Sequence, residues 1–241
     1  MAEDFESPHQ MAESEYWHQL DLFATEVDNA NEIYHTHEEI NCLALTDQDV
    51  RAALDKHANF WTVQVYCLQT SLMMVLARIF DTDDDTHSVH KVINSTIRSW
   101  NIFSKDSLEK RKITHGVVGK DLENFMGRTW APSCARDLRH LKKALVAHST
   151  RYKNAYRPIR DKFFAHRVIN DPNKVWDLFA ATNRTEIGET ITFLSDLVET
   201  LRDLYQNGRE PVLGGQRSGA YIRKIRDEVK EVLSRIAAAD H

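Results

Sequence analysis

A run of 107 residues without a single glycine or proline, between Pro8 and Gly116, is the strongest constraint on how this chain can fold. Glycine and proline mark most turns and interrupt helices, so a stretch this long without either favours long helices with few tight turns. The length of 241 residues allows one large domain or two smaller ones. We therefore expect a mainly helical protein.

Apolar residues repeat with the period of an α-helix through most of the chain. From Val50 to Ile79 successive apolar positions are three or four residues apart, which predicts one helix of about 30 residues as the spine of a bundle. A period of two, typical of strands, is nearly absent, so we expect an all-α fold: a helical bundle with long antiparallel helices and an extra C-terminal helix. The remaining apolar stripes predict helices over 13–40, 87–100, 104–113, 138–166, 187–205 and 222–236.

Turn residues cluster in only two places, at 116–132 and 208–219. Asn207-Gly208 at the start of the second cluster is a good end for a helix. We see no internal repeat and no linker that would demand a second domain. The predicted organisation is a mobile acidic tail at 1–12, a helical bundle at 13–207, and a loop and C-terminal helix at 208–241 packed on the same domain.

Cysteine usage and apolar runs bear on the compartment. Cys42, Cys67 and Cys134 are far apart and form no Cys-x-x-Cys pair, which favours reduced thiols over a disulfide framework or a zinc site. The longest apolar run, 72–77, is much shorter than the ~18 residues of a membrane span. The first residues lack the basic and apolar regions of a secretory signal. These features predict a cytoplasmic protein without a membrane partner.

Charge is distributed very unevenly along the chain. Residues 1–50 carry a net charge of −13, whereas residues 134–167 carry +8, although the whole chain is only −5. A basic segment of this kind attracts polyanions, and binding of nucleic acid by such a surface is sensitive to salt. The simpler alternative is that the acidic first helix packs beside the basic segment and neutralises it, and both can hold if only one flank is covered.

An acidic stretch invites a calcium interpretation. Asp81, Asp83 and Asp85 have the spacing of the first ligands of an EF-hand loop. Thr86 stands where the loop needs glycine, and Val92 stands where it needs a bidentate glutamate. We therefore interpret this stretch as a polar turn before the next helix.

Two histidine pairs have the spacing of metal ligands on one face of a helix. His35 lies one helical turn before Glu39, and His87 lies three residues before His90. Neither pair forms a His-Glu-x-x-His motif, and the chain has no glycine-rich phosphate loop and no serine-hydrolase motif. We expect no metal and no cofactor, and a metal-dependent bundle enzyme is the weakest of the functional hypotheses.

The basic segment ends in the sequence RDKFFAHR, which starts at Arg160 and includes His166. Pro158, just before it, removes a helical hydrogen bond and predicts a kink or a restart of the helix. Ile159, Phe163 and His166 then share one face, so His166 is expected to point into the bundle seam or a cleft at its end. Arg160 lies about 120° around the helix from His166.

Arg160 and His166 therefore cannot be direct neighbours on one straight helix. They can act on one phosphate if the helix ends between them, or if a second copy completes the site in a two-fold dimer. The alternative is structural, with His166 near a helix C-terminus and Arg160 solvated.

The segment from Arg160 to His166 resembles the R-x(4–6)-H signature of the HEPN superfamily, in which a polar residue follows the arginine. Five residues separate the two here. The surrounding sequences, YRPIRDKFFAHRVINDPN and LARIFDTDDDTHSVHKVI, are most similar to AbiU-type HEPN proteins, which are linked to abortive infection in bacteria. The resemblance covers roughly residues 15–207.

This resemblance implies a dimeric helical bundle that acts as a metal-independent endoribonuclease in phage defence or a toxin–antitoxin system. His166 would serve as general acid/base at the RNA 2′-hydroxyl or the leaving oxygen, and Arg160 would stabilise charge on the phosphate. Asp161 would orient one of the two, and Arg78 or Asp81 could approach the same groove. The candidate RNA-binding cations nearby are Lys153, Arg157, Lys162 and Arg167.

A second function stays open at this stage. Many HEPN proteins keep the fold without activity, so the resemblance also allows a non-catalytic module that binds RNA or an antitoxin-like protein. A nucleotidyltransferase-type partner would have to be a separate protein, because this sequence shows no such domain.

Overall fold

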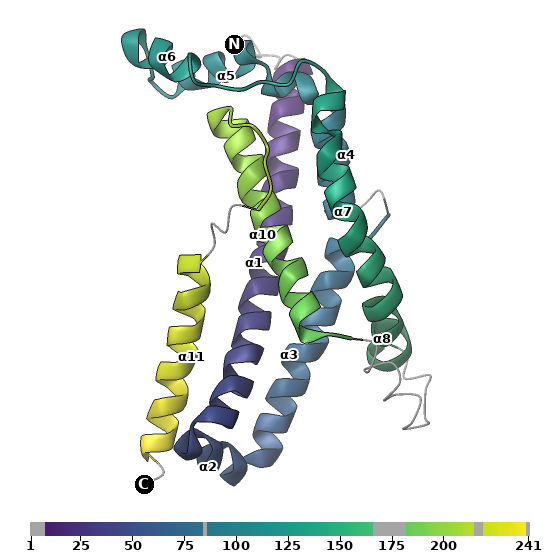
Figure 1. The fold of residues 1–241 in the computed structure, drawn as a ribbon, viewed down its shortest axis with the longest axis vertical. Coiled ribbons are helices and arrows are strands. Elements are labelled where there is room, and N and C mark those ends of the chain that lie inside the picture. Colours follow the sequence, from purple (N-terminus) through teal and green to yellow (C-terminus); the bar gives the residue numbers. More distant parts are fainter. Residues whose placement is uncertain (1–7, 84–85, 166–181, 215–218, 240–241) are drawn as a thin grey trace, which may run out of the picture. The chain divides into compact units, whose positions relative to one another are not determined.

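The computed structural model describes residues 8–83, 86–165, 182–214 and 219–239. Within these ranges the chain forms helices and no β-strand, which confirms the predicted all-α class (Figure 1). The chain divides into two compact units, which we describe separately. Unit 1 comprises residues 1–25, 79–150 and 193–215, and unit 2 comprises residues 26–78, 151–192 and 216–241.

Unit 1 is built around the first part of α1 and the last part of α10. Tyr16 of α1 is buried and meets Phe103 edge to face, with ring centroids 5.1 Å apart. Leu141 and Leu197 are fully buried in the same unit. Its helices are α1 (Pro8–Thr46), α4 (Val89–Arg98), η1 (Trp100–Phe103), α5 (Lys105–Thr114), α6 (Gly119–Met126), η2 (Ala135–Leu138), α7 (Arg139–Arg151) and α10 (Arg184–Asn207).

Unit 2 contains the second part of α1, the first part of α10 and the C-terminal helix α11. One of its cores joins the end of α1 to α2 and α11, where Leu43, Val50 and Leu233 are buried together. Val229 and Ile236 of α11 pack against the same cluster. The further helices of unit 2 are α2 (Gln48–Lys56), α3 (Ala58–Ile79), η3 (Tyr152–Tyr156), α8 (Arg157–Ile159), η4 (Arg160–Ala165) and α11 (Gly219–Ala239).

The prediction of one helix from Val50 to Ile79 was wrong, because the chain turns at His57 between α2 and α3. The His57 amide donates to the Leu54 carbonyl, and this closes α2. Leu54 and Trp61, on either side of the turn, both pack on the same core cluster, so the apolar spacing continues across the break. The longest helix is α1, whose 39 residues extend well beyond the expected 13–40.

Two further boundaries differ from expectation. Residues 8–12, expected in a tail, belong to α1, and residues 1–7 lie outside the described residues. Helix α6 occupies part of the expected loop at 116–132. Its glycines suggested a loop, but Gly116, which lies before the helix, and Gly119, its first residue, both have positive φ. The Lys112 ammonium lies 4.4 Å from the Phe125 ring centre and joins α5 to α6.

The predicted end of α10 at Asn207-Gly208 is confirmed. Gly208 has φ 56°, a left-handed conformation that favours glycine. A side chain there would also meet Leu108, because an added Cβ would lie 2.5 Å from the Leu108 Cδ2. The Gly208 carbonyl accepts a hydrogen bond from the Trp130 amide at 2.7 Å, which ties the end of α10 to the α6–η2 connection.

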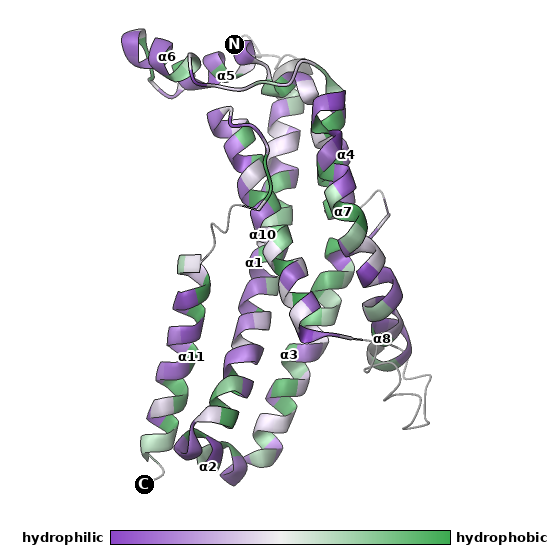
Figure 2. Cartoon of the chain, in the orientation of Figure 1, coloured by the Kyte–Doolittle hydropathy of each residue, from purple (hydrophilic) through white to green (hydrophobic). Residues whose placement is uncertain are grey.

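Helix α3 is apolar for much of its length (Figure 2). Within the described residues it is the one helix long and apolar enough to cross a membrane, judged by length and composition. A core helix of a soluble protein passes the same test. Leu72, Val75 and Leu76 in its second half are buried, as expected for a core helix, whereas Phe60 and Val63 in its first half are exposed.

Candidate functional site

Arg160 and Asp161 form a close ion pair at the start of η4 in unit 2. The Arg160 Nε donates to the Asp161 Oδ1 at 2.6 Å, and the Arg160 Nη2 contacts the same oxygen. The Arg160 side chain is 27% exposed and that of Asp161 37%. A carboxylate that accepts from two nitrogens fixes the plane of a guanidinium. The role of Asp161 in a reaction stays a prediction.

A second guanidinium shares the same carboxylate. The Arg157 Nε lies 3.5 Å from the Asp161 Oδ2, one helical turn away, and the Arg157 side chain is 56% exposed. Lys153 and Lys162 are also exposed. The segment therefore presents one carboxylate among four cations, and its local field is positive.

The helix is distorted on both sides of Pro158. η3 and η4 are π-helices, and only the three residues of α8 between them are α-helical. At the first π turn the Arg157 amide donates to the Tyr152 carbonyl, five residues back. A proline clashes with the carbonyl four residues earlier in a regular α-helix, and the wider turn relieves that clash. The predicted disruption at Pro158 thus takes the form of two π turns.

Buried residues beneath this segment fix its position in unit 2. Ile159 is only 1% exposed and Tyr156 2%. The Tyr156 hydroxyl donates to the Asn183 carbonyl at 3.0 Å, and burial raises the pKa of this phenol. Arg151, just before η3, pairs with Glu189 at 3.1 Å. The polar residues of the segment are held by this packing, although the helix itself is irregular.

The partner of Arg160 in the sequence motif lies outside the described residues. His166 and the cation Arg167 both follow η4, which ends at Ala165. The structure therefore brings together Arg160, Asp161 and Arg157 from the predicted set. The relation of His166 to Arg160 stays a prediction.

Arg78 and Asp81 have other partners. The Arg78 guanidinium binds Glu26 in unit 2, with Nε 3.1 Å from both carboxylate oxygens and Nη2 2.8 Å from one. Asp81 belongs to unit 1 and accepts hydrogen bonds from the Thr82 and Asp83 amides. The Asp81 bonds fit the predicted polar turn, and the N-cap of the following helix is Ser88.

The described residues contain no group of three metal-ligating side chains. His35, one of the candidate ligands, is buried, and burial together with the positive charge of Arg226 lowers its pKa to about 4. Its partner in the candidate pair, Glu39, lies 3.9 Å from the Arg226 Nε. His35 is therefore a neutral core residue at physiological pH.

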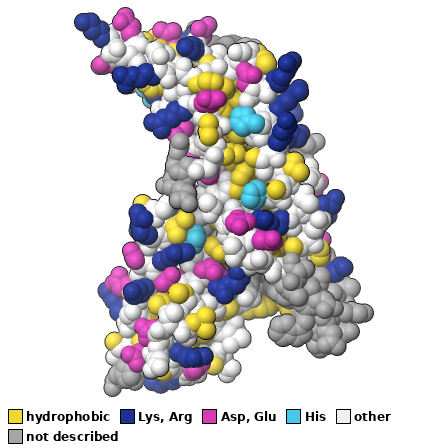
Figure 3. Space-filling model, viewed as in Figure 1, with side chains coloured by type: hydrophobic (Ala, Val, Ile, Leu, Met, Phe, Trp, Pro, Cys, Tyr) yellow, Lys and Arg dark blue, Asp and Glu magenta, His cyan; other side chains and the backbone are white. Residues whose placement is uncertain are grey.

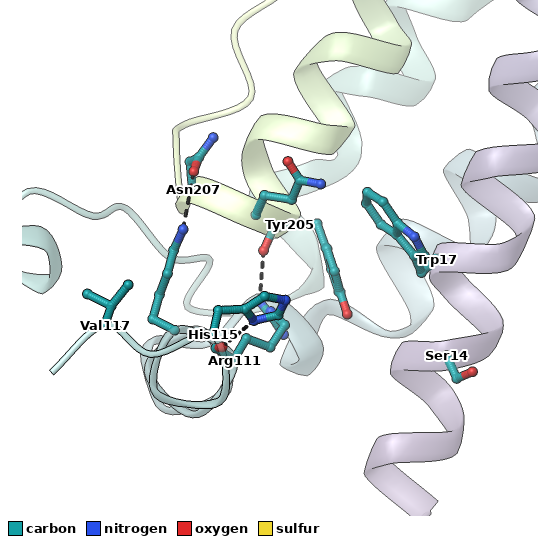
Figure 4. Close-up of a pocket in the computed structure, with 9 residues that line it drawn as sticks. Ser14, Trp17, Arg111, His115, Val117, Tyr205 and Asn207 are labelled. Atoms are coloured by element: carbon teal, nitrogen blue, oxygen red, sulfur yellow. Dashed lines mark hydrogen bonds between the residues drawn. The ribbon is translucent and has the colours of Figure 1, made fainter. Parts of the chain in front are cut away.

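A cavity of about 540 Å³ in unit 1 was not foreseen from the sequence. Figure 4 shows Tyr205 between Arg111 and Trp17. The Trp17 and Tyr205 rings stack with centroids 5.1 Å apart, and the Arg111 guanidinium lies 4.2 Å from the Tyr205 ring centre. Arg111 also binds Glu13 and the Ile102 and Tyr205 carbonyls, so it joins α5 to α1 and α10. These contacts account for Arg111 as a structural residue.

A second concave surface in unit 1 was missed for a different reason. A groove of about 470 Å³ lies between α4 and α7. Its cations come from distant parts of the sequence, because Arg98 belongs to α4 and the others to α7. The basic segment at 134–167 predicted the cations on α7, but no sequence pattern indicated that they lie beside α4. The groove is lined by Asn94, Ile97, Arg98, Arg139, Lys142 and Lys143.

Comparison with protein families decides what kind of protein this is. The family model HEPN_AbiU2, described as AbiU2, matches residues 14–221. This protein belongs to the AbiU2 family of HEPN domains. The match contains the whole segment from Arg160 to Arg167, as well as α4, α7 and the complete α10. Neither a curated protein nor a solved structure matches the chain.

Within this AbiU2-type HEPN protein, the R-x5-H segment and the α4–α7 groove are separate features. The first belongs to unit 2 and the second to unit 1. The family match confirms the predicted AbiU-type HEPN family, which is associated with abortive infection. A reaction for this protein is proposed below.

Proposed function

We propose that this HEPN protein is a metal-independent endoribonuclease in bacterial defence against phage or in a toxin–antitoxin system. His166 acts as the general acid/base, Arg160 stabilises charge on the scissile phosphate, and Asp161 orients Arg160. No metal or other cofactor takes part in the proposed reaction.

The ion pair between Arg160 and Asp161 is the observation that carries this proposal. A guanidinium held on one side by a carboxylate is pre-oriented, so less conformational entropy is lost when it meets a phosphate. The pair also sits in a π-helical turn, and π turns within helices are frequent at functional sites. The family match is consistent with this choice, since it covers residues 160–166, the segment that resembles the HEPN signature.

The proposed chemistry needs two proton transfers at one phosphate. The RNA 2′-oxygen attacks the adjacent phosphorus and loses its proton to a base, and the bond from phosphorus to the 5′-oxygen breaks as that oxygen gains a proton from an acid. The products are a 2′,3′-cyclic phosphate and a 5′-hydroxyl. Histidine suits both transfers because its ordinary pKa lies near neutrality.

A homodimer would supply both transfers at once. In a two-fold dimer built around the R-x5-H segment, one His166 takes the proton and the partner's His166 gives one, while Arg160 binds a phosphate oxygen. This arrangement would also overcome the expected separation of Arg160 and His166, which would lie about 120° apart around one straight helix. We propose the dimer as the active form.

RNA cleavage in the presence of EDTA tests the proposal. Wild type and the His18→Ala variant should cleave a labelled RNA to products with a 2′,3′-cyclic phosphate. His166→Ala should lose cleavage by about 10²–10⁴-fold, the usual contribution of general acid–base catalysis. His18 is the matched control because it is an exposed histidine outside the proposed site. Equal cleavage by wild type and His166→Ala would refute the catalytic role, provided their thermal unfolding agrees.

A second candidate function has its own supporting observation. Asp161 already neutralises much of the charge of Arg160, and such a pair can also serve simply to hold a helix turn in place. The protein would then be a non-catalytic HEPN module that binds RNA, an antitoxin-like protein or a nucleotidyltransferase-type partner. Salt-dependent RNA retention without cleavage, or a stable complex with a protein encoded beside it, would favour this function.

A further inference from the structure

The α4–α7 groove of unit 1 gathers positive charge, and none of the described residues that line it is acidic. Arg98 comes from the last turn of α4, while Arg139, Lys142 and Lys143 come from the first turns of α7. All four side chains belong to exposed residues. Figure 3 shows lysine and arginine side chains gathered along the edge of the molecule over these helices.

Arg98 and Arg139 differ from most of the arginines that the structure describes, which are bound to carboxylates. Arg78, Arg151 and Arg184, for example, each pair with a glutamate. In the part of the chain that the structure describes, no carboxylate lies within ion-pair distance of the four groove cations. Their positive charge is therefore available to a ligand.

The carboxylate nearest in sequence is already engaged elsewhere. Asp137, in η2 just before α7, accepts hydrogen bonds from the Ser133 amide at 2.7 Å and the Cys134 amide at 3.3 Å. It holds the turn that starts η2. The groove thus keeps its charge although an acidic residue stands two positions before Arg139.

The two helices that form the groove are fixed to each other and to unit 1. The Lys142 Nζ donates to the Asn94 Oδ1 at 3.2 Å, and the His90 Nε2 lies 3.5 Å from the Ser149 Oγ. The His140 ring links α7 to the segment after α10, since its Nε2 lies 2.7 Å from the Pro211 carbonyl oxygen. These bonds keep the spacing of the cations constant.

Burial of the opposite faces explains why the cations point outward. Val92 and Ile93 of α4 and Leu141 and Leu145 of α7 are at most 3% exposed. The residues on the other side of each helix must then face the solvent or the groove. The pattern that builds the core of unit 1 thus also places its cations on one surface.

We propose that this groove binds the phosphodiester backbone of RNA, independently of base sequence. Arginine forks and lysine ammonium groups fit phosphate oxygens. None of the described residues that line the groove has an aromatic ring on which a base could stack, so we expect the contacts to be to the backbone. Arg98, Arg139, Lys142 and Lys143 are the backbone-binding residues, with Asn94 as a neutral donor. The inference rests on the proposed function only for the choice of RNA as the polyanion.

An acidic protein is the alternative partner for such a surface, and the lining argues against it. Protein interfaces have apolar and aromatic centres. Here Ile97 is the single apolar side chain among the lining residues that the structure describes. A surface of cations around one isoleucine fits a chain of phosphates better than a folded protein.

Binding of a fluorescein-labelled single-stranded RNA by the full-length His166→Ala protein provides the test, since this background removes the proposed cleavage. The groove variant carries Arg98→Gln, Arg139→Gln, Lys142→Gln and Lys143→Gln. The matched control carries Arg51→Gln, Lys110→Gln, Arg128→Gln and Lys230→Gln, which remove the same charge from exposed residues elsewhere. Thermal unfolding of both variants checks that they fold. If the groove variant does not fold, an Arg139→Gln, Lys143→Gln double variant replaces it in the binding measurement.

The groove variant should bind RNA more weakly than the control, and equally so for unrelated RNA sequences. Removal of one cation–phosphate interaction lowers the slope of log affinity against log salt by about 0.7, so removal of all four lowers it by about two to three. Equal affinity and salt slope in the groove variant and the control would overturn the inference. Displacement of RNA by polyglutamate at equal charge concentration would also overturn it, because the groove would then bind acidic chains in general.

The two proposals fail in different ways. Groove-dependent RNA binding by a wild-type protein that cleaves no RNA refutes the proposed function and supports this inference. Cleavage that requires His166, together with unchanged RNA affinity in the groove variant, supports the proposed function and refutes this inference.

Discussion

The basic segment at 134–167 divides into two regions with different structures. Its first part forms the α7 side of the groove in unit 1, on a regular helix whose other face is buried. Its second part forms the π-helical segment in unit 2, where Arg157 and Arg160 share the Asp161 carboxylate. One stretch of sequence thus supplies two kinds of cation. Those of the groove have no carboxylate partner among the described residues, whereas Arg157 and Arg160 are paired with Asp161.

The difference indicates different roles for chemically similar side chains. A paired guanidinium has a defined direction, which suits stabilisation of charge at one reacting phosphate. Cations along a groove whose described lining has no carboxylate add long-range attraction and salt-dependent binding but little geometric precision. We therefore assign the chemistry to unit 2 and the binding of the RNA backbone to unit 1.

Replacement of Arg160 should produce the largest effect on the reaction. Arg160→Ala removes a donor aimed at the phosphate and should lower the cleavage rate by about 10²–10³-fold. Arg160→Lys keeps the positive charge but lacks the planar, forked N–H donors of a guanidinium, so its cleavage rate should fall between those of Arg160→Ala and wild type. Steady-state cleavage of a labelled RNA in EDTA measures both. Equal rates for Arg160→Lys and Arg160→Ala would show that the fork, and not the charge, is what matters.

Acid should weaken unit 2 through His35. Burial lowers the pKa of His35 to about 4 from an ordinary value of 6.5, so the unfolded chain binds the proton more readily than the folded one. Stability is therefore highest above pH 6.5 and declines as the pH falls toward 4, by up to about 3 kcal/mol. Hydrogen exchange of α2 and α11, compared with α4 and α7 at pH 7 and pH 5, would reveal the loss.

Substitution identifies His35 as the source of this acid sensitivity. His35→Leu should flatten the pH dependence of unfolding, while substitution of the exposed His18 with glutamine should leave it unchanged. An unaltered pH profile in His35→Leu would mean that another group controls the acid response.

Neutralising Asp161 should have an intermediate effect. Asp161→Asn removes two charge-assisted contacts to guanidinium groups, each of a kind worth about 1.5–3 kcal/mol at most in folded proteins and less at this exposure. We expect cleavage about tenfold slower, with RNA binding no weaker because a negative charge is lost. Asp227→Asn, at an exposed position of α11, is the control. Faster cleavage by Asp161→Asn would mean that the carboxylate restrains Arg160.

The smallest expected effect is electrostatic and lies beside the groove. Burial is the main reason that the pKa of His90 is lowered, and the charge of Lys142 lowers it further. Lys142→Gln should raise this pKa part of the way toward its ordinary value, as measured by NMR titration of the imidazole. Lys143→Gln should leave it where it is. An unchanged value in Lys142→Gln would place its ammonium farther from His90 than the structure does.

The fold was predictable wherever local sequence and packing agree. The end of α10 at Asn207-Gly208 follows from a requirement for left-handed backbone that glycine meets. The turn at His57 was not predictable, because Leu54 and Trp61 pack on one cluster from both sides of it and keep the helical spacing intact. Apolar spacing records which residues face a core, and it does not record whether the helix between them is continuous.

The candidate site was predictable only in part, for a related reason. The pairing of Arg160 with Asp161 follows from adjacent residues, and Pro158 indicated the local distortion. The groove needs Arg98 and Arg139 on one surface, although they are 41 positions apart in the sequence. They line the same groove because α4 and α7 bury their apolar faces in the same unit. Such contacts between distant segments leave no signature in a single sequence.

The division of labour between the two regions can be tested most directly by measuring kcat and KM for RNA cleavage in Arg160→Ala and in the four-residue groove variant, both with the wild-type His166. We predict that the groove variant raises KM and reaches nearly the wild-type kcat at saturating RNA, whereas Arg160→Ala lowers kcat. A groove variant with reduced kcat and unchanged KM, or an Arg160→Ala variant altered in KM alone, would contradict this division.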